Sequence, residues 1–555
     1  MASSLHTEKR SASPPAKMSA EWTVPYLLRY AAREYGDRTF LQIVGGSSQS
    51  YAEVHRSAMK MAAKLHYLGV RPQDKVLIML TNGLEAIHGW FGSNLLNAVD
   101  VSINTGFRGK SLEHAVNLSG AKVMLTSSSY IKVIEQSAGN LPGLEFVVLI
   151  DDGPLESSAL TQAGIRVLRY LTLDDSNLSS SEYLVNPWDV GSVIYTSGTS
   201  GPAKGVQMPQ GQITLLAKLS AAKMALCAQD IFFCFYPLYH MAGKFMSVLA
   251  TLSVGGKLVL DAGFSPELWL ERIRTYGATV TAAHGPMLEM VFALPPTPSD
   301  RDHKLRLIRT SPFPKRIATE FEARFKVKGL ENWGMTEIGV PCWTPLDEPL
   351  RVGSCGRIDK DWYEFAVVDP VTDAVLSTGQ VGEFVVRPKQ PWTVTLGYLG
   401  MPEMTVETWR NLWFHTGDCG RIDAEGYVYF IDRAKERIRR RAENISASDI
   451  ESAALCHHCV ADAAAVGVPS EFESDDDIKL CVVPRPNATL TPETLLRFLV
   501  QQLPHYMVPR YVQFFDKLPR TATGKLQRTT LKLVAADDEI WDRKSAGIAL
   551  RDLLN

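Results

Sequence analysis

The stretch YTSGTSGPAKG, residues 195–205, decides the fold of this chain. It follows a short apolar run, Val190 to Ile194, which is typical of a buried strand. Its three glycines permit backbone conformations that a Cβ atom forbids, and its hydroxyl side chains and Lys204 supply donors and one cation. Free N–H groups, hydroxyls and a lysine on one loop suit the phosphates of a nucleotide.

This loop differs from the Walker A phosphate loop, in which a glycine precedes the lysine and a serine or threonine follows it. Here Ala203 precedes Lys204 and Gly205 follows it. A Ser/Gly-rich surface turn is the alternative interpretation for an isolated stretch of this composition. The order of the residues, together with other motifs along the chain, favours a phosphate loop.

The composition is that of a globular chain long enough for several domains. It has 555 residues, 45% hydrophobic and 21% charged, with a net charge of −2 that gives no reason to expect a nucleic-acid partner. Its eight cysteines lack disulfide-like spacing, which favours a reducing compartment. We expect residues 1–20 to be disordered, no transmembrane segment, and a cytoplasmic protein, since neither a signal peptide nor a C-terminal Ser-Lys-Leu is present.

One short segment carries four metal-ligating side chains, Cys456, His457, His458 and Cys459. We predict that the four lie on one helix. Side chains so close together on a helix cannot all converge on one ion, so we expect no structural zinc there.

Apolar strand-like runs alternate with helical patterns over the first two thirds of the chain, which argues for α/β layers with largely parallel sheets. The expected strands are 75–80, 122–126, 146–150, 231–235, 257–260 and 279–282, and the expected helices include 84–97 and 266–276. After about Gly353 the pattern changes to short strands at 383–387 and 427–431. A helix at 448–455 and a strand at 463–468 then indicate a separate small α+β unit, with a boundary near Lys435.

Five motifs, found in the same order along the chain, resemble those of the adenylate-forming superfamily, which includes acyl-CoA synthetases, luciferases and adenylation domains of peptide synthetases. The resemblance covers about residues 20 to 535, and two segments, 97–114 and 439–446, most resemble the carnitine/crotonobetaine-CoA ligase type. The motifs are YTSGTSGPAKG, WGMTE (333–337), WFHTGD (413–418), DRAKERIRRRAENIS (432–446) and PRTATGK (519–525).

The resemblance implies an α/β fold with a large N-terminal domain of stacked α/β sheets plus a distorted β-barrel. A small, mobile α+β C-terminal domain would carry a catalytic lysine. On this basis we expect a disordered segment 1–20, an adenylation domain 21–434, a lid domain 435–545 and a tail 546–555.

The resemblance also implies how ATP and Mg²⁺ are bound. Glu337 would hold Mg²⁺, because hard cations prefer carboxylate oxygens. Thr336 would contact the α-phosphate, and Trp333 would stack on adenine. Asp418 would accept two hydrogen bonds from the ribose hydroxyls, and Arg433 would reach the ribose or phosphate. Lys525 would bridge the substrate carboxylate and the α-phosphate. The remaining expected nucleotide-binding residues are Thr196, Ser197, Gly198, Thr199, Lys204, Gly334 and Met335.

Other expected site residues concern the acid and coenzyme A. His240 would lie near the acyl carboxylate, with a core histidine as the alternative. Lys435 would be the domain hinge, although the basic run around it has a nucleic-acid patch as its alternative. The expected coenzyme A residues are Arg441, Ala442 and Glu443, and the expected acyl-pocket residues are Tyr239, Met241, His284, Gly285, Met287, Ser311 and the segment Arg309–Pro314.

Two departures from the family pattern bear on this interpretation. Thr310-Ser311-Pro312-Phe313-Pro314 replaces a glycine-rich stretch before the adenine motif, and proline lacks an N–H donor. Ala442 stands where the family has a glycine beside the pantetheine arm, and its methyl group restricts the backbone. Thioester formation is therefore less firmly implied than adenylation.

We interpret the chain as a ligase that activates a small carboxylic acid to acyl-AMP with release of pyrophosphate. It would then transfer the acyl group to coenzyme A as cosubstrate. The first alternative is transfer to an amine, and the second is a non-catalytic nucleotide- or acyl-binding protein on the same fold. The identity of the acid and the oligomeric state are left open.

Overall fold

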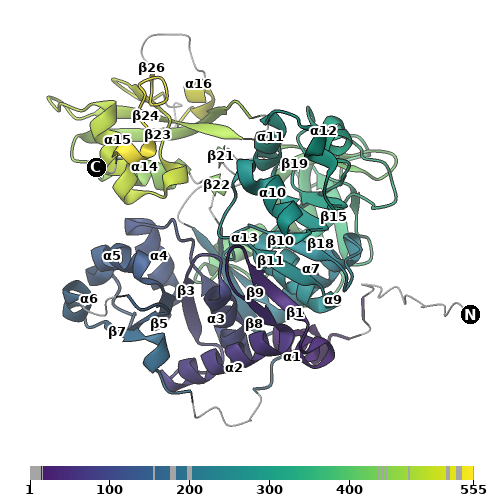
Figure 1. Ribbon diagram of the computed structural model, residues 1–555. Coiled ribbons are helices and arrows are strands. Elements are labelled where there is room, and N and C mark those ends of the chain that lie inside the picture. The colour runs from purple at the N-terminus through teal and green to yellow at the C-terminus, as the bar shows by residue number, and fades with distance from the viewer. Residues whose placement is uncertain are drawn as a thin grey trace, which may run out of the picture.

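The structure is a computed structural model that describes residues 14–15, 17–153, 157–175, 183–196, 203–433, 438–440, 443–445, 447–472, 475–519, 526–532 and 540–553. A large domain runs to Arg433, and a small domain lies above it in the view of Figure 1. None of the helices in these ranges is both long enough and apolar enough to cross a bilayer.

The first of two large sheets has seven strands and carries the phosphate-loop motif. All its neighbouring strands are parallel except the last pair, which is antiparallel. Both faces are covered, as parallel strands with apolar sequences require. The order is β7 (Arg166–Arg169), β6 (Phe146–Leu149), β5 (Val123–Thr126), β3 (Lys75–Met79), β4 (Val99–Ser102), β8 (Val190–Thr196) and β9 (Lys204–Pro209).

The second large sheet has nine strands and a parallel centre with antiparallel edges. The carboxyl ends of its central strands lead to His240, to His284 and to the adenine motif. The order is β16 (Arg357–Ile358), β15 (Gly339–Trp343), β14 (Lys328–Met335), β13 (Leu307–Thr310), β12 (Val280–Ala283), β10 (Ile231–Cys234), β11 (Lys257–Leu260), β1 (Thr39–Ile43) and β2 (Ser48–Ser50).

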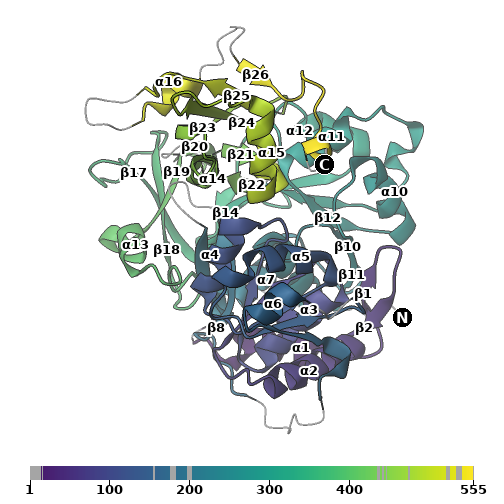
Figure 2. The same cartoon turned by 90° about the vertical axis from the view of Figure 1, so that its left-hand side faces the viewer.

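Helices pack between and around these sheets, as Figures 1 and 2 show. The helices of the large domain are α1 (Val24–Tyr35), α2 (Tyr51–Tyr67), α3 (Leu84–Leu95), α4 (Gly109–Ser119), α5 (Ser128–Ser137), α6 (Ser158–Gln162), α7 (Gln210–Lys223), α8 (Met241–Gly243), α9 (Ala250–Val254), α10 (Pro266–Tyr276), α11 (Gly285–Ala293), α12 (Ala318–Phe325) and α13 (Pro402–Thr408). A π-helical stretch, Lys244–Leu249, joins α8 to α9.

Local sequence signals set the ends of several helices. Ser50 and Glu53 form a reciprocal capping box at the start of α2, which satisfies two N–H groups that the helix leaves unpaired. Pro266 occupies the first turn of α10, and Gly277 ends this helix in the left-handed conformation at φ 65°. This pairing of proline at the start with glycine at the end explains why α10 matches its predicted bounds.

The remaining sheets are antiparallel or mixed and lie toward the C-terminus. The region expected to be a distorted barrel contains a four-stranded antiparallel sheet of β17 (Tyr363–Val368), β18 (Gly382–Pro388), β19 (Phe414–Ile422) and β20 (Val428–Arg433). The small domain contains β21 (Ile438–Arg440), β22 (Glu443–Ile445), β23 (Val460–Pro469), β24 (Asp476–Pro484), β25 (Tyr511–Phe514), β26 (Ile540–Asp542), α14 (Ala447–Leu455), α15 (Pro492–Gln502) and α16 (Arg528–Lys532).

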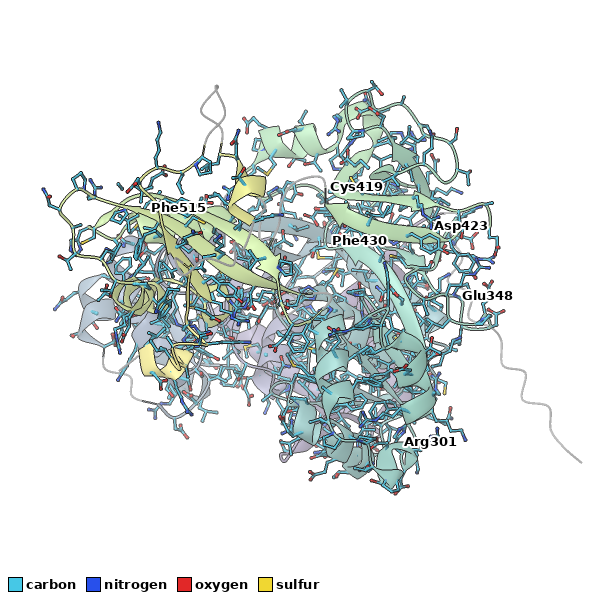
Figure 3. All side chains as sticks on the ribbon, turned by 90° about the horizontal axis from the view of Figure 1, so that it is seen from above. Arg301, Glu348, Cys419, Asp423, Phe430 and Phe515 are labelled. Carbon is cyan, nitrogen blue, oxygen red and sulfur yellow. The ribbon has the colours of Figure 1, made fainter. Side chains whose placement is uncertain are left out.

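The two domains touch through polar contacts. The Asn104 side-chain amide donates to the hydroxyl of Tyr506 at 3.0 Å, and Arg316 donates to the backbone oxygen of Glu471 at 3.2 Å. In Figure 3, Phe515 marks the small domain, and Cys419 and Phe430 mark the four-stranded sheet of the large domain. Leu553 is buried in the small domain's core, so the chain packs against this domain almost to its end.

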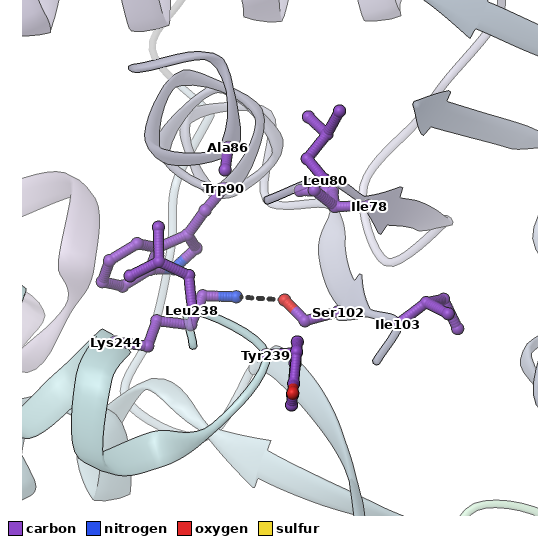
Figure 4. Close-up of a pocket in the computed structure, with 9 residues that line it drawn as sticks. All are labelled: Ile78, Leu80, Ala86, Trp90, Ser102, Ile103, Leu238, Tyr239 and Lys244. Carbon is purple, nitrogen blue, oxygen red and sulfur yellow. Dashed lines mark hydrogen bonds between the residues drawn. The ribbon is translucent and has the colours of Figure 1, made fainter. Parts of the chain in front are cut away.

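A buried ion pair joins the two large sheets. Lys244, at the start of the π-helical stretch, donates to Asp100 on β4 and, at 2.7 Å, to Ser102. Asp100 also accepts a hydrogen bond of 2.7 Å from Ser192 on β8. Lys244 and Ser102 border a cavity of about 10 Å³, which is room for about one water molecule and is otherwise lined mainly by apolar side chains, as Figure 4 shows.

We predict that Lys244→Met lowers the free energy of unfolding by about 3–5 kcal/mol, because it leaves the Asp100 carboxylate buried without its cation. The double variant Lys244→Met/Asp100→Asn removes both charges and keeps an acceptor for Ser192, so most of the loss is recovered. Urea unfolding of the three proteins measures this. If the double variant were at least as unstable as the single variant, the loss of stability would not come from the unpaired charge of Asp100.

Candidate active site

The phosphate-loop motif is held by a β-hairpin. Thr196, the last residue of β8, lies opposite Lys204, the first residue of β9, in antiparallel register. The sequence predictions for Ser197, Gly198 and Thr199 concern residues outside the described part of the chain. The hairpin therefore fixes the two ends of the loop, and Lys204 Nζ lies 4.9 Å from the ring centroid of Tyr398.

The predicted magnesium residue, Glu337, lies in the tight turn between β14 and β15. Gly334 is required there, because an added Cβ atom would lie 2.1 Å from the backbone oxygen of Gly339. Glu337 is only 4% exposed, and its Oε1 accepts a hydrogen bond of 2.9 Å from the Tyr398 hydroxyl. The geometry presents a buried carboxylate at the end of a strand.

Backbone contacts position the same turn. Gln212 on α7 donates from its side-chain amide to the backbone oxygens of Thr336 and Glu337, at 2.8 and 3.1 Å. The Thr395 N–H donates to the Glu337 oxygen at 2.7 Å. Thr336 is itself buried at 5% exposure. The predicted α-phosphate and magnesium residues are thus adjacent and held from two sides.

The predicted adenine and ribose residues are in direct contact. The indole N–H of Trp333 donates to Asp418 Oδ2 at 3.0 Å. Trp333 is 6% exposed and makes edge-to-face contacts with Phe365 and Phe384. Arg433 lies opposite Asp418 in the β19–β20 ladder. Stacking of Trp333 on adenine stays a prediction, as do the ribose roles of Asp418 and Arg433.

A second cluster lies at the carboxyl ends of β10, β12 and β13, where ligands of parallel sheets usually bind. The His240 and His284 rings are 6.2 Å apart, and Tyr236 meets His284 edge-on at 4.7 Å. His284 Nδ1 lies 3.1 Å from the Ser311 backbone oxygen. Three predicted acid-site residues, His240, His284 and Ser311, thus come together.

His240 is uncharged at neutral pH. Burial, together with the nearby positive charge of Arg309, lowers the pKa of His240 to about 4. Its Nδ1 accepts the N–H of Ala242 at 3.2 Å, so the proton of the neutral ring is carried by Nε2. His240 can therefore offer one N–H donor to a ligand without adding charge.

The other predicted acyl-pocket residues are spread more widely. Gly285 is buried at the start of α11, while Met241 and Met287 pack into different apolar clusters of the large domain. Tyr239 lines the cavity beside Lys244 (Figure 4). Whether these four residues contact the acid stays a prediction.

Several predicted residues cannot be placed. The catalytic lysine, Lys525, the hinge residue, Lys435, and two coenzyme A residues, Arg441 and Ala442, lie outside the described residues. Glu443 begins β22, and the structure describes its backbone only. The roles proposed for these five residues rest on sequence resemblance.

Two residues in the site were not predicted. Tyr398 lies in the segment Gly397-Tyr398-Leu399, which hydrogen-bonds to β9 through Leu399 N–H to the Gly205 oxygen at 2.8 Å. Gln212 lies on an almost wholly buried helix. The only sequence signal for either is a polar group within an apolar context.

The helix predicted through Cys456 and Cys459 is wrong. Helix α14 ends at Leu455, and residues 456–459 form a turn. Ligand atoms of His457, His458 and Cys459 lie within 4.8 Å of one another. The two imidazole rings stack at an angle of 22°, so their in-plane lone pairs do not converge readily on one ion.

The chain matches two family models, "AMP-binding enzyme" over residues 28–399 and "AMP-binding enzyme C-terminal domain" over residues 449–525. It is 29% identical to 4-coumarate–CoA ligase 2 of Nicotiana tabacum, over 90% of this chain and 92% of that protein. It is 28% identical to crotonobetaine/carnitine–CoA ligase of Salmonella typhi, over 90% and 96%. A solved structure of o-succinylbenzoate CoA synthetase from Bacillus subtilis matches with a TM-score of 0.78 and 23% identity, over 91% of this chain and 98% of that one.

The depressed pKa of His240 predicts a stability loss in acid. The unfolded chain takes up a proton near pH 6.5, whereas the folded chain resists protonation down to about pH 4, so stability falls as the pH drops through this window. At pH 5.5 the contribution of His240 is a loss of about 1–2 kcal/mol relative to pH 7.5.

Urea unfolding of the wild type and of His240→Gln at pH 7.5, 6.5, 5.5 and 4.5 measures this loss. The variant should lose less stability over the same window. His88, whose pKa burial also lowers to about 4, is present in both proteins and serves as the internal reference. Equal pH dependence in the two proteins would show that His240 titrates normally.

Proposed function

The chain belongs to the AMP-binding enzyme family, and from that membership we propose that it activates a carboxylic acid with ATP and transfers the acyl group to coenzyme A. Two of its curated relatives carry the name of CoA ligases and match it over nearly their whole length. The proposal therefore concerns an acid–thiol ligase that forms AMP.

The main support for this proposal is the contact between the expected nucleotide residues. These residues come from three separate sequence motifs, and hydrogen bonds and packing join them into a single group. Tyr398 lies between Lys204 and Glu337, and Trp333 donates to Asp418. Buried carboxylates carry a desolvation cost, which a bound nucleotide and its metal ion would offset.

In the first step a carboxylate oxygen of the acid attacks the α-phosphorus of ATP. A bond forms between this oxygen and phosphorus, the bond to the β-phosphate bridging oxygen breaks, and pyrophosphate leaves with that electron pair. In the second step the thiolate of coenzyme A attacks the acyl carbon, and AMP departs as the leaving group. Both steps concentrate negative charge, which the protein must stabilise.

The residues supply complementary parts of this chemistry. Lys204 and Lys525 would neutralise phosphate charge, and Thr336 would donate to the α-phosphate. Neutral His240 would donate through Nε2 near the acid. Asp418 would accept hydrogen bonds from ribose hydroxyls.

Magnesium fits at Glu337, whose buried carboxylate oxygen is the kind of ligand that this ion prefers. When bound, Mg²⁺ supplies charge neutralisation for the phosphates of the nucleotide. The Tyr398 hydroxyl donates to this carboxylate, while the Gln212 side-chain amide and the Thr395 N–H donate to the Glu337 backbone oxygen and so hold the turn in place.

The test is a panel of carboxylic acids incubated with ATP and Mg²⁺, with and without coenzyme A, followed by mass spectrometry. We expect at least one acid to give acid-dependent pyrophosphate release, and an acyl-CoA product only when coenzyme A is present. An amide in the presence of an amine, with no thioester, would point instead to the amide-forming alternative. An absence of both products would favour a binding protein.

Glu337→Gln is predicted to raise the Mg²⁺ concentration needed for half-maximal ATP–pyrophosphate exchange by about ten-fold or more, because the amide keeps the shape but removes the charge. Magnesium titrations of the two proteins at saturating ATP measure this. Asp300→Asn, which changes a buried carboxylate paired with Arg324 outside the site, is the matched control. An unchanged magnesium requirement in Glu337→Gln would contradict the assignment.

A further inference from the structure

Arg309 is a buried cation without an acidic partner among the described residues. It is the third residue of β13 and is 4% exposed. Its Nη1 lies 3.6 Å from Met246 Sδ, its Nη2 lies 3.4 Å from the Ala242 oxygen, and its Nε has no hydrogen-bond partner. These are weak contacts for a group with five N–H donors.

Other arginines of the same domain form an ion pair with an acidic side chain. Arg306, three residues earlier, pairs with Asp230 at 2.8 Å, and Arg324 pairs with Asp300 at 2.7 Å. Even the fully buried Lys244 has Asp100 beside it. A buried guanidinium without an anion is costly, so its retention calls for a partner that the described residues do not supply.

The location of Arg309 identifies where such a partner would lie. The guanidinium contacts Ala242, two residues after His240, and lies 5.8 Å from the ring centroid of Tyr236. Tyr236 in turn contacts His284. Arg309 therefore belongs to the cluster at the carboxyl ends of β10, β12 and β13. Its positive charge contributes to the lowered pKa of His240.

The reacting carboxylate of the acid is a poor candidate for this partner. Arg309 lies opposite Leu330 in the β13–β14 ladder, and Thr336, the expected α-phosphate residue, follows six residues later. Five of these steps, from Leu330 to Met335, lie in β14 and give a backbone path of roughly 17 Å at about 3.3 Å per residue, and Thr336 follows in the turn. A carboxylate at the Thr336 end is therefore separated from the backbone of Arg309, whereas a second anionic group on the same acid can meet the guanidinium, because the acid and the arginine side chain both extend toward each other.

We propose that Arg309 binds a second anionic group at the far end of the acid, so that the substrate class is a dicarboxylic acid or another acid with a distal negative charge. This inference rests on the proposed function and narrows it. A carboxylate suits the fork of the guanidinium, which can form two parallel N–H···O bonds. The proposal places His240, two residues before Ala242, beside this distal group rather than beside the reacting carboxylate that the family resemblance implied, and neutral His240 brings no competing charge there.

The experiment compares acids that differ only in their distal group. Adipate is paired with hexanoate, and terephthalate with 4-methylbenzoate, within a series of increasing chain length. ATP–pyrophosphate exchange gives kcat/KM for each acid with the wild type, Arg309→Met, Arg309→Lys and Arg306→Met. The last variant removes a nearby arginine that already has its own acidic partner.

We expect the wild type to prefer the dianionic member of at least one pair, and Arg309→Met to reduce that preference by about 10- to 100-fold, the range for a hydrogen bond to a charged group. Arg309→Lys should keep part of the preference, and Arg306→Met all of it. A wild type that prefers the methyl-ended acid in every pair would overturn the inference. So would a preference unchanged by Arg309→Met.

Two further measurements test the anion site at Arg309 independently of the proposed ligase function. Thermal unfolding should show that Arg309→Met has a higher Tm than the wild type without ligand, because a buried unpaired charge is removed, whereas a structural role for Arg309 requires a lower one. Millimolar adipate should raise the Tm of the wild type but not of Arg309→Met. If no acid supports exchange, the proposed function fails, and the adipate shift alone decides whether Arg309 is an anion site.

Discussion

The hydrogen bond from the Tyr398 hydroxyl to Glu337 is the contact on which the arrangement of the site depends. Tyr398 lies in a segment hydrogen-bonded to β9, and Lys204 at the start of β9 lies over its ring. Glu337 lies at the end of β14 in the other large sheet. Burial, together with the Glu337 carboxylate, raises the pKa of Tyr398, so the hydroxyl keeps its proton and donates at physiological pH. One bond thus connects the phosphate loop of the first sheet to the carboxylate of the second.

Charge is distributed unevenly around this connection. Glu337 and Asp418 place buried negative charge where magnesium and ribose are proposed to bind. Arg309 places buried positive charge at the far side, near a histidine that burial keeps neutral. Between the sheets, Lys244 and Asp100 cancel each other. Lys244 and Asp100 are thus compensated within the protein, whereas Arg309 has no acidic partner among the described residues, which costs stability and, under the proposal, gives specificity.

Local signals in the sequence were sufficient to predict several of the strands and helices that position the site. The sequence predicted the strand before the phosphate loop and helix α10, because glycine, proline and apolar periodicity act over a few residues. The family motifs are likewise short stretches that can be recognised locally. The roles of Tyr398 and Gln212 could not be predicted, nor could the lack of an acidic partner for Arg309 among the described residues, since each depends on segments far apart in the chain. The helix expected through Cys459 was wrong because its apolar pattern stops at Leu455, where a turn begins.

A double-mutant cycle on Tyr398 and Glu337 tests the central claim most directly. The quantity measured is kcat/KM for acid-dependent ATP–pyrophosphate exchange in the wild type, Tyr398→Phe, Glu337→Gln and the double variant. If the bond organises the site, the two substitutions are non-additive, with a coupling free energy of about 1 kcal/mol or more. Additive effects within about 0.5 kcal/mol would contradict it, and would show that the two residues act independently.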